Sequence, residues 1–283
     1  MDPDTLFLHM GPGYNARMEA KLLGDQLWPP GLWFWDQPPS ASFAALTQSA
    51  EEALNGLYAS CQRPVSVVAH SFGVHLGVEL LKRCPEQVGN CHFIAPCQNP
   101  YAGFRNLAHS LVSADWPPES WRYKAQEFLP GMSDDLDDFW RLIFLILECP
   151  DFMRAYWQHR ISYEEYKTIA ETVPGIDLPT FQAVLNSFHE TSPSSVDASE
   201  VNPSLGSRTV SFYLGAHDPL VNAREEAAYW RKIFPRGSFS IFEDSGHFPH
   251  LEGRGKNLIA RLLREQRSPF SHPHPDPHRL THL

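Results

Sequence analysis

The chain has 283 residues, 42% of them hydrophobic and 20% charged, which is typical of a globular protein with one elaborated domain or two small ones. Acidic residues outnumber basic ones by 33 to 23, and the resulting net charge of −10 argues against nucleic acid or an anionic lipid surface as a partner. No apolar run approaches the roughly 20 residues that a membrane span needs, and the first residues lack the pattern of a signal peptide. We therefore expect a cytoplasmic protein without a membrane span.

Short β-type runs alternate with helical patterns in the first hundred residues. Residues 65–69 form a nearly continuous apolar run, Val-Ser-Val-Val-Ala, as expected of a strand buried on both faces of a parallel sheet. Ser42 precedes a helical pattern and is expected to cap it. The predicted strands are 5–9, 32–35, 65–69 and 91–95, and the predicted helices are 18–27, 46–58 and 74–83.

The pattern changes after residue 98. From Tyr101 to Pro203 the sequence has helical periodicity and no convincing strand, which predicts a helical insertion. Alternation resumes with strands at 208–214 and 239–242 and helices at 223–234 and 255–266. Strands that alternate with helices on both sides of an insertion indicate an α/β fold, with a mostly parallel sheet covered by helices on both faces. We predict a core of residues 1–98 and 204–267, a helical cap or lid of 99–203, and a separate tail of 268–283.

Neither the cysteines nor the histidine-rich tail predicts a metal site. The five cysteines are odd in number and form no CxxC pair, which favours reduced, buried thiols over a disulfide frame or a zinc site. The tail contains His272, His274, His278 and His282, but alternate prolines from Pro273 to Pro277 exclude a compact helical site. We expect the tail to be disordered and the protein to need neither a metal nor another cofactor.

The strongest local motif is Ala69-His70-Ser71-Phe72-Gly73, which lies where a buried strand turns into a helix. Small residues on both sides of a serine at such a turn let the strand and the helix approach, and they predict a nucleophile elbow with strained backbone at Ser71. Ala69 stands where glycine is commoner. The alternative is that Ser71 is an ordinary helix N-cap.

A serine hydroxyl needs a base to take its proton and a third group to orient that base. Asp218 and His247 each follow a predicted strand, so both should lie at the carboxyl edge of the sheet, where open α/β sheets keep their sites. Asp244 and, less well, Glu243 are alternatives for the acid. His9, His70 and His250 are expected to pack or to form structural hydrogen bonds, although His70 could also belong to the pocket.

Four motifs of the sequence resemble those of the α/β-hydrolase-fold family and occur in the same order along the chain. Leu8-His9-Met10-Gly11-Pro12-Gly13 is similar to the oxyanion loop of that family, with Met10 in place of a glycine, and Asp36-Gln37 resembles a pair found in proline iminopeptidase-like members. Residues 215–218 and 246–252 match the acid and histidine motifs. Pro38-Pro39 replaces the usual arginine-glycine, so the resemblance does not imply a peptidase. It covers about residues 5–98 and 205–266 and implies an α/β-hydrolase fold whose usual leading hairpin is missing.

The order serine, acid, histidine is that of this family, and the roles follow from the chemistry. Ser71 attacks an acyl carbonyl, His247 accepts and returns the proton, and Asp218 orients His247 and stabilises its charged form. The backbone N–H of Phe72, with that of Gly11 or Met10, is expected to bind the oxyanion.

We predict a serine hydrolase that acts on an ester or thioester, or else on an amide, of a small molecule with an apolar group. The alternatives are a C–C hydrolase, an acyltransferase or cyclase with the same triad, and a hydrolase-like ligand receptor. Aromatic residues of the insertion could line the apolar pocket or could pack between helices. These candidates are Trp116, Trp121, Phe128, Phe139, Trp140, Phe144, Tyr156, Trp157, Tyr163 and Phe188. Oligomeric state is not predicted.

Overall fold

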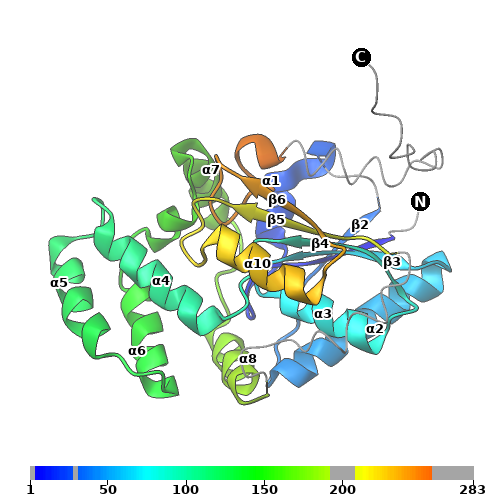
Figure 1. Ribbon diagram of the computed structural model, residues 1–283, viewed down its shortest axis with the longest axis horizontal. Coiled ribbons are helices and arrows are strands. Elements are labelled where there is room, and N and C mark those ends of the chain that lie inside the picture. Colours follow the sequence, from blue (N-terminus) through cyan, green and yellow to red (C-terminus); the bar gives the residue numbers. More distant parts are fainter. Residues whose placement is uncertain (1–3, 28–30, 192–207, 257–283) are drawn as a thin grey trace.

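A six-stranded sheet, parallel throughout, forms the centre of the molecule (Figure 1), in the order β2-β1-β3-β4-β5-β6. The computed structural model describes residues 4–27, 31–191 and 208–256. The strands are β1 (Thr5–Leu8), β2 (Leu32–Trp35), β3 (Val65–His70), β4 (Val88–Ile94), β5 (Val210–Gly215) and β6 (Ser238–Phe242). All six predicted strands are present, and their ends differ from the predicted ones by at most three residues.

Alternate residues of the central strands enter two separate apolar cores. In β3, Val67 and Ala69 face one core and Val68 faces the other. In β5, Phe212 and Tyr213 divide in the same way. Because both sides of these strands are removed from water, their sequences are apolar at successive positions, which is the pattern expected of a covered parallel sheet.

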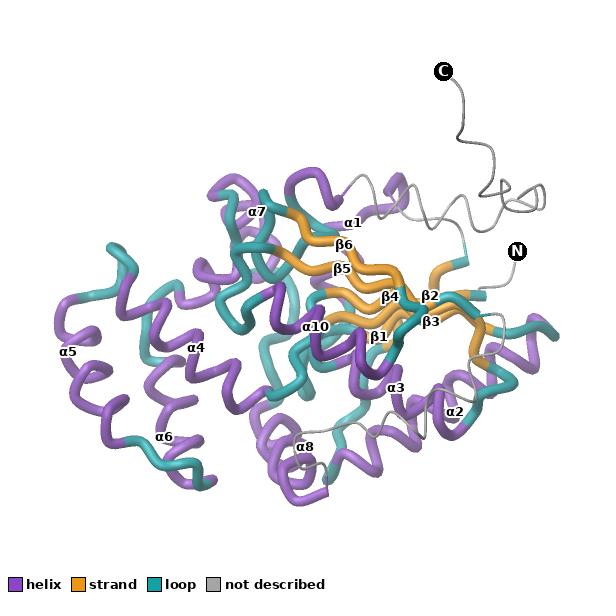
Figure 2. The backbone as a smooth tube through the Cα atoms, in the orientation of Figure 1, coloured by secondary structure: helices purple, strands orange, loops and turns teal. Residues whose placement is uncertain are grey.

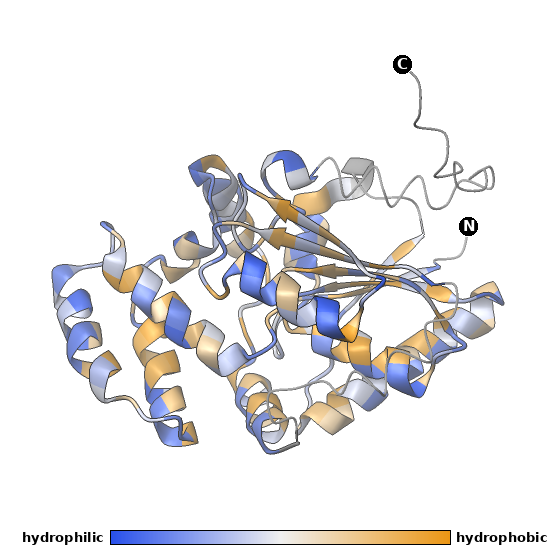
Figure 3. Cartoon of the chain, in the orientation of Figure 1, coloured by the Kyte–Doolittle hydropathy of each residue, from blue (hydrophilic) through white to orange (hydrophobic). Residues whose placement is uncertain are grey.

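Helices cover both faces of the sheet (Figure 2). Helices α2 (Phe43–Cys61), α3 (Gly73–Arg83) and α10 (Ala223–Ile233) contribute to one core, and α1 (Arg17–Leu27) contributes to the other. Figure 3 shows the hydrophobic residues concentrated on the strands and on one side of the flanking helices. The Ser42 hydroxyl accepts a hydrogen bond from the N–H of Ala45 and caps α2. The predicted α/β fold with helices on both faces is confirmed.

Between β4 and β5 the described residues form helices only. Helices α4, α5 and α6 lie beside one another beyond the end of the sheet, and α7 and α8 lie closer to it (Figure 1). Two short 3-10 turns, η1 and η2, interrupt the series. The bounds are α4 (Pro100–Ser113), α5 (Glu119–Phe128), η1 (Leu129–Gly131), α6 (Leu136–Leu147), η2 (Phe152–Tyr156), α7 (Arg160–Ala170) and α8 (Leu178–Thr191).

Some sequence-based expectations fall outside the described residues. They are most of the predicted helix 255–266, the tail 268–283 with its four histidines, and the predicted end of the insertion at 192–203. The five cysteines are described, and none forms a disulfide. Within the described ranges, no helix combines the length and apolarity that crossing a bilayer requires.

Glu226 is a buried acid that joins α10 to the segment after β4. One carboxylate oxygen accepts hydrogen bonds from the N–H of Gln98 (2.6 Å) and from the indole of Trp230 (2.8 Å). Burial raises the pKa of Glu226 to about 7, because its effect is larger than that of the two hydrogen bonds, which lower the pKa. The folded state therefore keeps this proton at pH values where the unfolded chain, with a pKa near 4.5, has released it.

We expect Glu226→Gln to become relatively more stabilising as pH rises. The wild-type protein loses stability between about pH 4.5 and 7 as its buried carboxyl is forced to ionise, by about 3 kcal/mol at most, and the amide has no such cost. Urea unfolding at pH 4.5 and pH 8 measures this change. The exposed neighbour Glu225 supplies the control Glu225→Gln, and an effect of Glu226→Gln that is the same at both pH values would contradict the prediction.

Candidate active site

Ser71 occupies a sharp turn between β3 and α3. Its backbone φ is +55°, in the left-handed region that residues with a side chain rarely adopt, and its N–H donates to the carbonyl of Ile94 (2.9 Å). Helix α3 begins at Gly73, and its N-cap position is Phe72 without a side-chain cap. The hydroxyl of Ser71 is therefore not used as a helix cap and faces His247 instead.

Gly73 allows this turn because no side chain fits there. A Cβ at this position would collide with the carbonyl oxygen of Leu8 and would lie 2.7 Å from that of His9. Both of these are backbone atoms of the segment that leads into residues 10–13. The glycine thus brings the start of α3 against the end of β1, and it sets Ser71 beside the loop with Met10 and Gly11.

A second close approach brings together the loops that follow β5 and β6. A Cβ on Gly215 would collide with the carbonyl oxygen of Gly246, so only glycine permits the two backbones to lie this close. The N–H of His217 donates to the carbonyl of Ser245 (3.0 Å) across the same gap. Asp218 and His247 follow immediately in their loops and are placed side by side.

The structure joins the three predicted catalytic side chains in one hydrogen-bonded row. His247 Nδ1 lies 2.7 Å from Asp218 Oδ2, and His247 Nε2 lies 2.9 Å from Ser71 Oγ. With the carboxylate as acceptor, Nδ1–H donates to Asp218 and Nε2 is left to accept the hydroxyl proton of Ser71. The other carboxylate oxygen accepts from the N–H of Leu220 (2.8 Å), which fixes the plane of the carboxylate. This arrangement is able to activate a serine hydroxyl.

The alternative acids are not in this row. A carboxylate oxygen of Asp244 accepts from the N–H of Arg254 (3.1 Å), and the Asp244 carbonyl accepts from the ring of His159 (2.8 Å). Glu243 is exposed. The structure therefore pairs His247 with Asp218 and gives Asp244 a part in the turn after β6.

A cavity of about 80 Å³ opens onto Ser71 and His247. Its wall is apolar and comes from both parts of the chain, with Leu220 on the core side and residues of α4, α6, η2 and α8 on the other. Among the described residues, no Lys, Arg, Asp or Glu side chain lines it. The residues from these helices include Phe104, Ile143, Phe152, Met153, Tyr156 and Phe181.

The sequence located this wall only in part. Of the ten aromatic residues proposed for the pocket, Tyr156 lines the cavity and the other nine do not. Trp121 and Phe139 are examples, since they are 4% and 1% exposed and pack within the apolar cores. Helical periodicity shows which side of a helix is buried, but the cavity takes only a few residues from each helix.

Met10, Gly11 and Phe72 also line the cavity beside Ser71. Among the described residues, none of their backbone N–H groups donates a hydrogen bond to the protein, which leaves these donors available to a ligand. His9 is fully buried below this loop. Its Nδ1 lies 2.8 Å from the carbonyl of Met10, and the N–H of Gln37 donates to its Nε2 (3.3 Å). His9 therefore supports the loop from behind.

Glu252 stabilises the loop of His247, and the sequence analysis assigned it no role. Its Oε1 accepts from the N–H of Gly246 (2.6 Å), and its Oε2 accepts from the N–H groups of Gln158 (3.1 Å) and His159 (3.0 Å). Burial raises the pKa of Glu252, although these backbone N–H groups lower it. One carboxylate thus ties the loop after β6 to the segment after η2.

Glu19 is the other acid that the sequence analysis missed. It lies on α1 with its side chain 1% exposed, and it contacts His70 and His250. The signal was present in the sequence, because Leu22 and Leu23 follow at the spacing that puts them on the same helix face as Glu19. An acid on the apolar face of a helix predicts a buried partner, but not which one.

The comparisons with known proteins agree with this fold. Residues 6–260 match the model of the Alpha/beta hydrolase family. The comparison with curated proteins finds no match. Among solved structures, the chain is similar to the proline iminopeptidase-related protein of Thermus thermophilus, with 20% identity and a TM-score of 0.59 over 93% of this chain and 88% of that one.

Two further structures have lower identity. The 2-hydroxy-6-oxo-6-phenylhexa-2,4-dienoate hydrolase of a Rhodococcus species is 16% identical, with a TM-score of 0.57 over 94% of this chain and 91% of that one. A thermophilic esterase of Thermogutta terrifontis is 15% identical, with a TM-score of 0.52 over 94% of this chain and 90% of that one. At these identities the likeness concerns the fold alone.

We expect Gly73→Ala to lower the free energy of unfolding by about 1–3 kcal/mol, because the added methyl group must push apart two backbone segments. Urea unfolding followed by tryptophan fluorescence measures the loss. Gly56→Ala is the matched control, since a Cβ at this exposed position of α2 meets nothing within 4 Å, and alanine there should be neutral or stabilising. Equal effects of the two substitutions would contradict the close approach at Gly73.

Proposed function

The chain belongs to the alpha/beta hydrolase family, and from this premise we propose that it is a serine hydrolase that cleaves a carboxylic ester or thioester with an apolar acyl group. The observation that carries the proposal is the hydrogen-bonded row of Ser71, His247 and Asp218 at the wall of an apolar cavity. None of the proposed steps calls on a cofactor or a metal.

In the proposed mechanism, Ser71 Oγ attacks the acyl carbonyl while its proton passes to His247 Nε2. Collapse of the tetrahedral intermediate breaks the bond to the alcohol or thiol, which takes the proton from His247 and leaves an acyl group on Ser71. Water then attacks the acyl-enzyme, with His247 again as base, and releases the acid. Asp218 stabilises the imidazolium in both halves of the reaction.

The developing negative charge on the carbonyl oxygen needs donors that are already in place. We propose the N–H of Phe72 together with that of Gly11 or Met10. Support comes from their position on the cavity wall beside Ser71 and from their unused N–H groups. Because these donors are backbone groups, side-chain substitutions at Met10 and Phe72 should affect the shape of the cavity more than the oxyanion.

The wall of the cavity favours an uncharged, apolar acyl group. The described part of the chain places no Lys, Arg, Asp or Glu in the wall to pair with the charged end of a peptide, and this places an ester or thioester before an amide. Residues of α4, α6 and α8 form part of the cavity wall. We therefore propose that residues 99–203 act as a lid over a core of 1–98 and 204–267.

C–C bond hydrolysis is the second candidate, because the same triad can support it and the fold is similar to that of the Rhodococcus dienoate hydrolase. The substrate named for that enzyme carries a carboxylate. The cavity described here has no cationic side chain to receive one, so we place ester or thioester hydrolysis first.

Ser71→Ala should remove nearly all turnover, by about 10⁴- to 10⁶-fold in kcat, and should leave the protein folded because one oxygen is lost. Treatment of the wild-type protein with a fluorophosphonate, followed by peptide mass mapping, should find the label on Ser71. Circular dichroism of the variant is the control for folding. A folded wild-type protein that takes no label would end the hydrolase proposal, and labelling followed by no turnover of any substrate would favour a ligand receptor.

The length of the acyl group should determine kcat/KM. We expect a rise of about fourfold for each added methylene, equivalent to about 0.8 kcal/mol, until the chain fills the cavity. A series of p-nitrophenyl esters and acyl thioesters of increasing length measures this. Ile143→Trp, which would narrow the cavity from α6, should move the optimum to shorter chains, whereas a profile indifferent to length in both proteins would contradict an acyl group in this cavity.

A further inference from the structure

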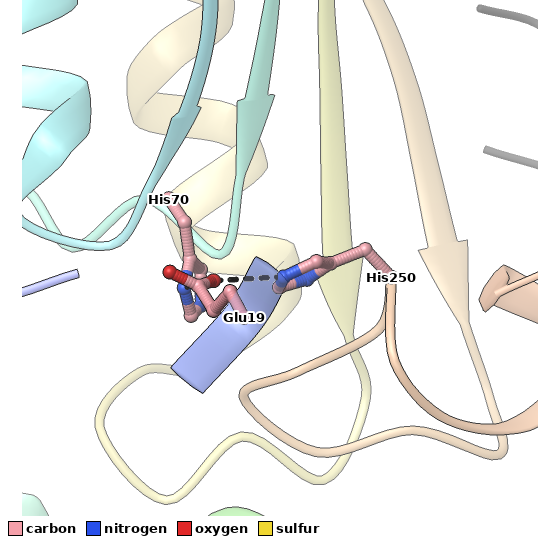
Figure 4. Close-up of side chains that lie close together, drawn as sticks. All are labelled: Glu19, His70 and His250. Atoms are coloured by element: carbon pink, nitrogen blue, oxygen red, sulfur yellow. Dashed lines mark hydrogen bonds and ion pairs between the residues drawn. The ribbon is translucent and has the colours of Figure 1, made fainter. Parts of the chain in front are cut away.

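Three buried polar side chains meet next to the proposed triad without taking part in it (Figure 4). They are Glu19 from the first turn of α1, His70 from the end of β3, and His250 from the loop that carries His247. The side chains are 1%, 0% and 0% exposed. The three therefore join the segments that carry the proposed nucleophile and the proposed base.

One oxygen of Glu19 contacts both rings, and its carboxylate lies between them in Figure 4. Oε1 is 2.7 Å from His70 Nδ1 and 2.9 Å from His250 Nε2. The other nitrogen of His70, Nε2, lies 3.0 Å from the carbonyl oxygen of His247. His70 is thus placed between Glu19 and the backbone of the proposed base.

Both oxygens that His70 faces are acceptors only. A neutral imidazole has one N–H, so it could serve either the carbonyl of His247 or the carboxylate of Glu19, and its remaining lone pair would face an oxygen at close range. An imidazolium donates from Nε2 to the carbonyl of His247 and forms an ion pair with the carboxylate of Glu19. At 2.7 Å from a carboxylate the charge attraction also acts whatever the alignment of the N–H bond.

The other charges in the cluster agree with one imidazolium. Burial alone would raise the pKa of Glu19, but His70 and the hydrogen bonds from the two histidines outweigh it and lower the pKa, so Glu19 is a carboxylate at neutral pH. Burial lowers the pKa of His250 to about 4 and also lowers that of His9, which leaves both rings neutral. A further titratable neighbour is His247 itself, whose ring centroid is 5.1 Å from that of His70. One cation therefore balances the buried carboxylate.

Resting on the proposed function, we propose that Glu19 is a positioning residue, whose carboxylate holds His70 as an imidazolium that hydrogen-bonds the carbonyl of His247 and thereby fixes the base beside Ser71. The N–H of His247 donates to the carbonyl of Tyr156 (2.8 Å), so the backbone of the base is held on both of its polar groups. Glu19 acts on the reaction through His70 and does not line the cavity.

A divalent metal bound by the same three side chains is the competing interpretation. Zinc holds its ligands at about 2.0–2.1 Å, which separates the donor atoms of a tetrahedral site by roughly 3.3 Å. The two contacts of Glu19 Oε1, at 2.7 and 2.9 Å, are hydrogen-bond distances. Both contacts are shorter than that separation, and the geometry therefore favours direct contact of the carboxylate with the two rings over a metal ion between them.

Glu19→Gln tests the proposal, because an amide keeps the shape of the side chain but removes the charge that holds the second proton on His70. We expect kcat and the rate of fluorophosphonate labelling at Ser71 to fall about 10- to 100-fold, with little change in KM. Glu19→Asp keeps the charge and should recover part of the rate. Glu226→Gln is the matched control, a buried acid whose hydrogen bonds come from Gln98 and Trp230, and it should label at the wild-type rate.

Ring ¹⁵N NMR of the wild-type protein at pH 7.5 tests the proton directly and needs no variant. Two protonated ring nitrogens are expected for His70, and one bare nitrogen would overturn the proposal. A stoichiometric metal ion in the purified protein would overturn it as well. So would a folded Glu19→Gln variant whose Ser71 is labelled at the wild-type rate. The proposed function is tested separately. It fails if the wild-type protein takes no label at Ser71, and this result does not depend on the NMR of His70.

Discussion

The parallel pairing of the strands from β3 to β6 is the constraint on which the rest of the molecule depends. Parallel strands place all of their carboxyl ends at one edge, so the residues that follow β3, β5 and β6 meet there although Ser71 and His247 are 176 residues apart. The hydrogen bonds from His247 to Ser71 and Asp218 then require backbones that approach closely at this edge. Gly73 and Gly215 permit two of these approaches.

The same edge carries several buried acids. Three carboxylates that are at most 8% exposed, Glu19, Asp218 and Glu252, surround the site. Burial of a charge is costly unless it is paired or hydrogen-bonded, and each of these acids has its own donors. They are histidine rings for Glu19 and Asp218, and backbone N–H groups for Glu252. The core holds the sheet together by apolar contact, whereas these bonds fix the loops at its edge.

The sequence predicted the sheet and the row of Ser71, His247 and Asp218 because both depend on local patterns. Each strand is a short apolar run, and each of the three residues lies within five residues of the end of a strand. Glu19 escaped prediction because its partner His250 is 231 residues away and no local pattern encodes that pairing. The cavity wall escaped for a related reason, since Phe104 and Phe181 are ordinary helical residues until α4 and α8 are placed over the sheet.

The proposed base belongs to both parts of the protein, and this limits how a lid could move. On the core side, His70 contacts the carbonyl of His247. On the helical side, the carbonyl of Tyr156 accepts a hydrogen bond from the N–H of His247, and the ring centroids of the two residues are 5.2 Å apart. Glu252 bonds the backbone at Gln158 and His159 as well. A lid that opened at residues 156–159 would break these bonds and release the base from Ser71. Opening between α4, α6 and α8 would uncover the apolar wall and leave the base in place, so the proposed lid could admit a substrate there without moving the proposed base.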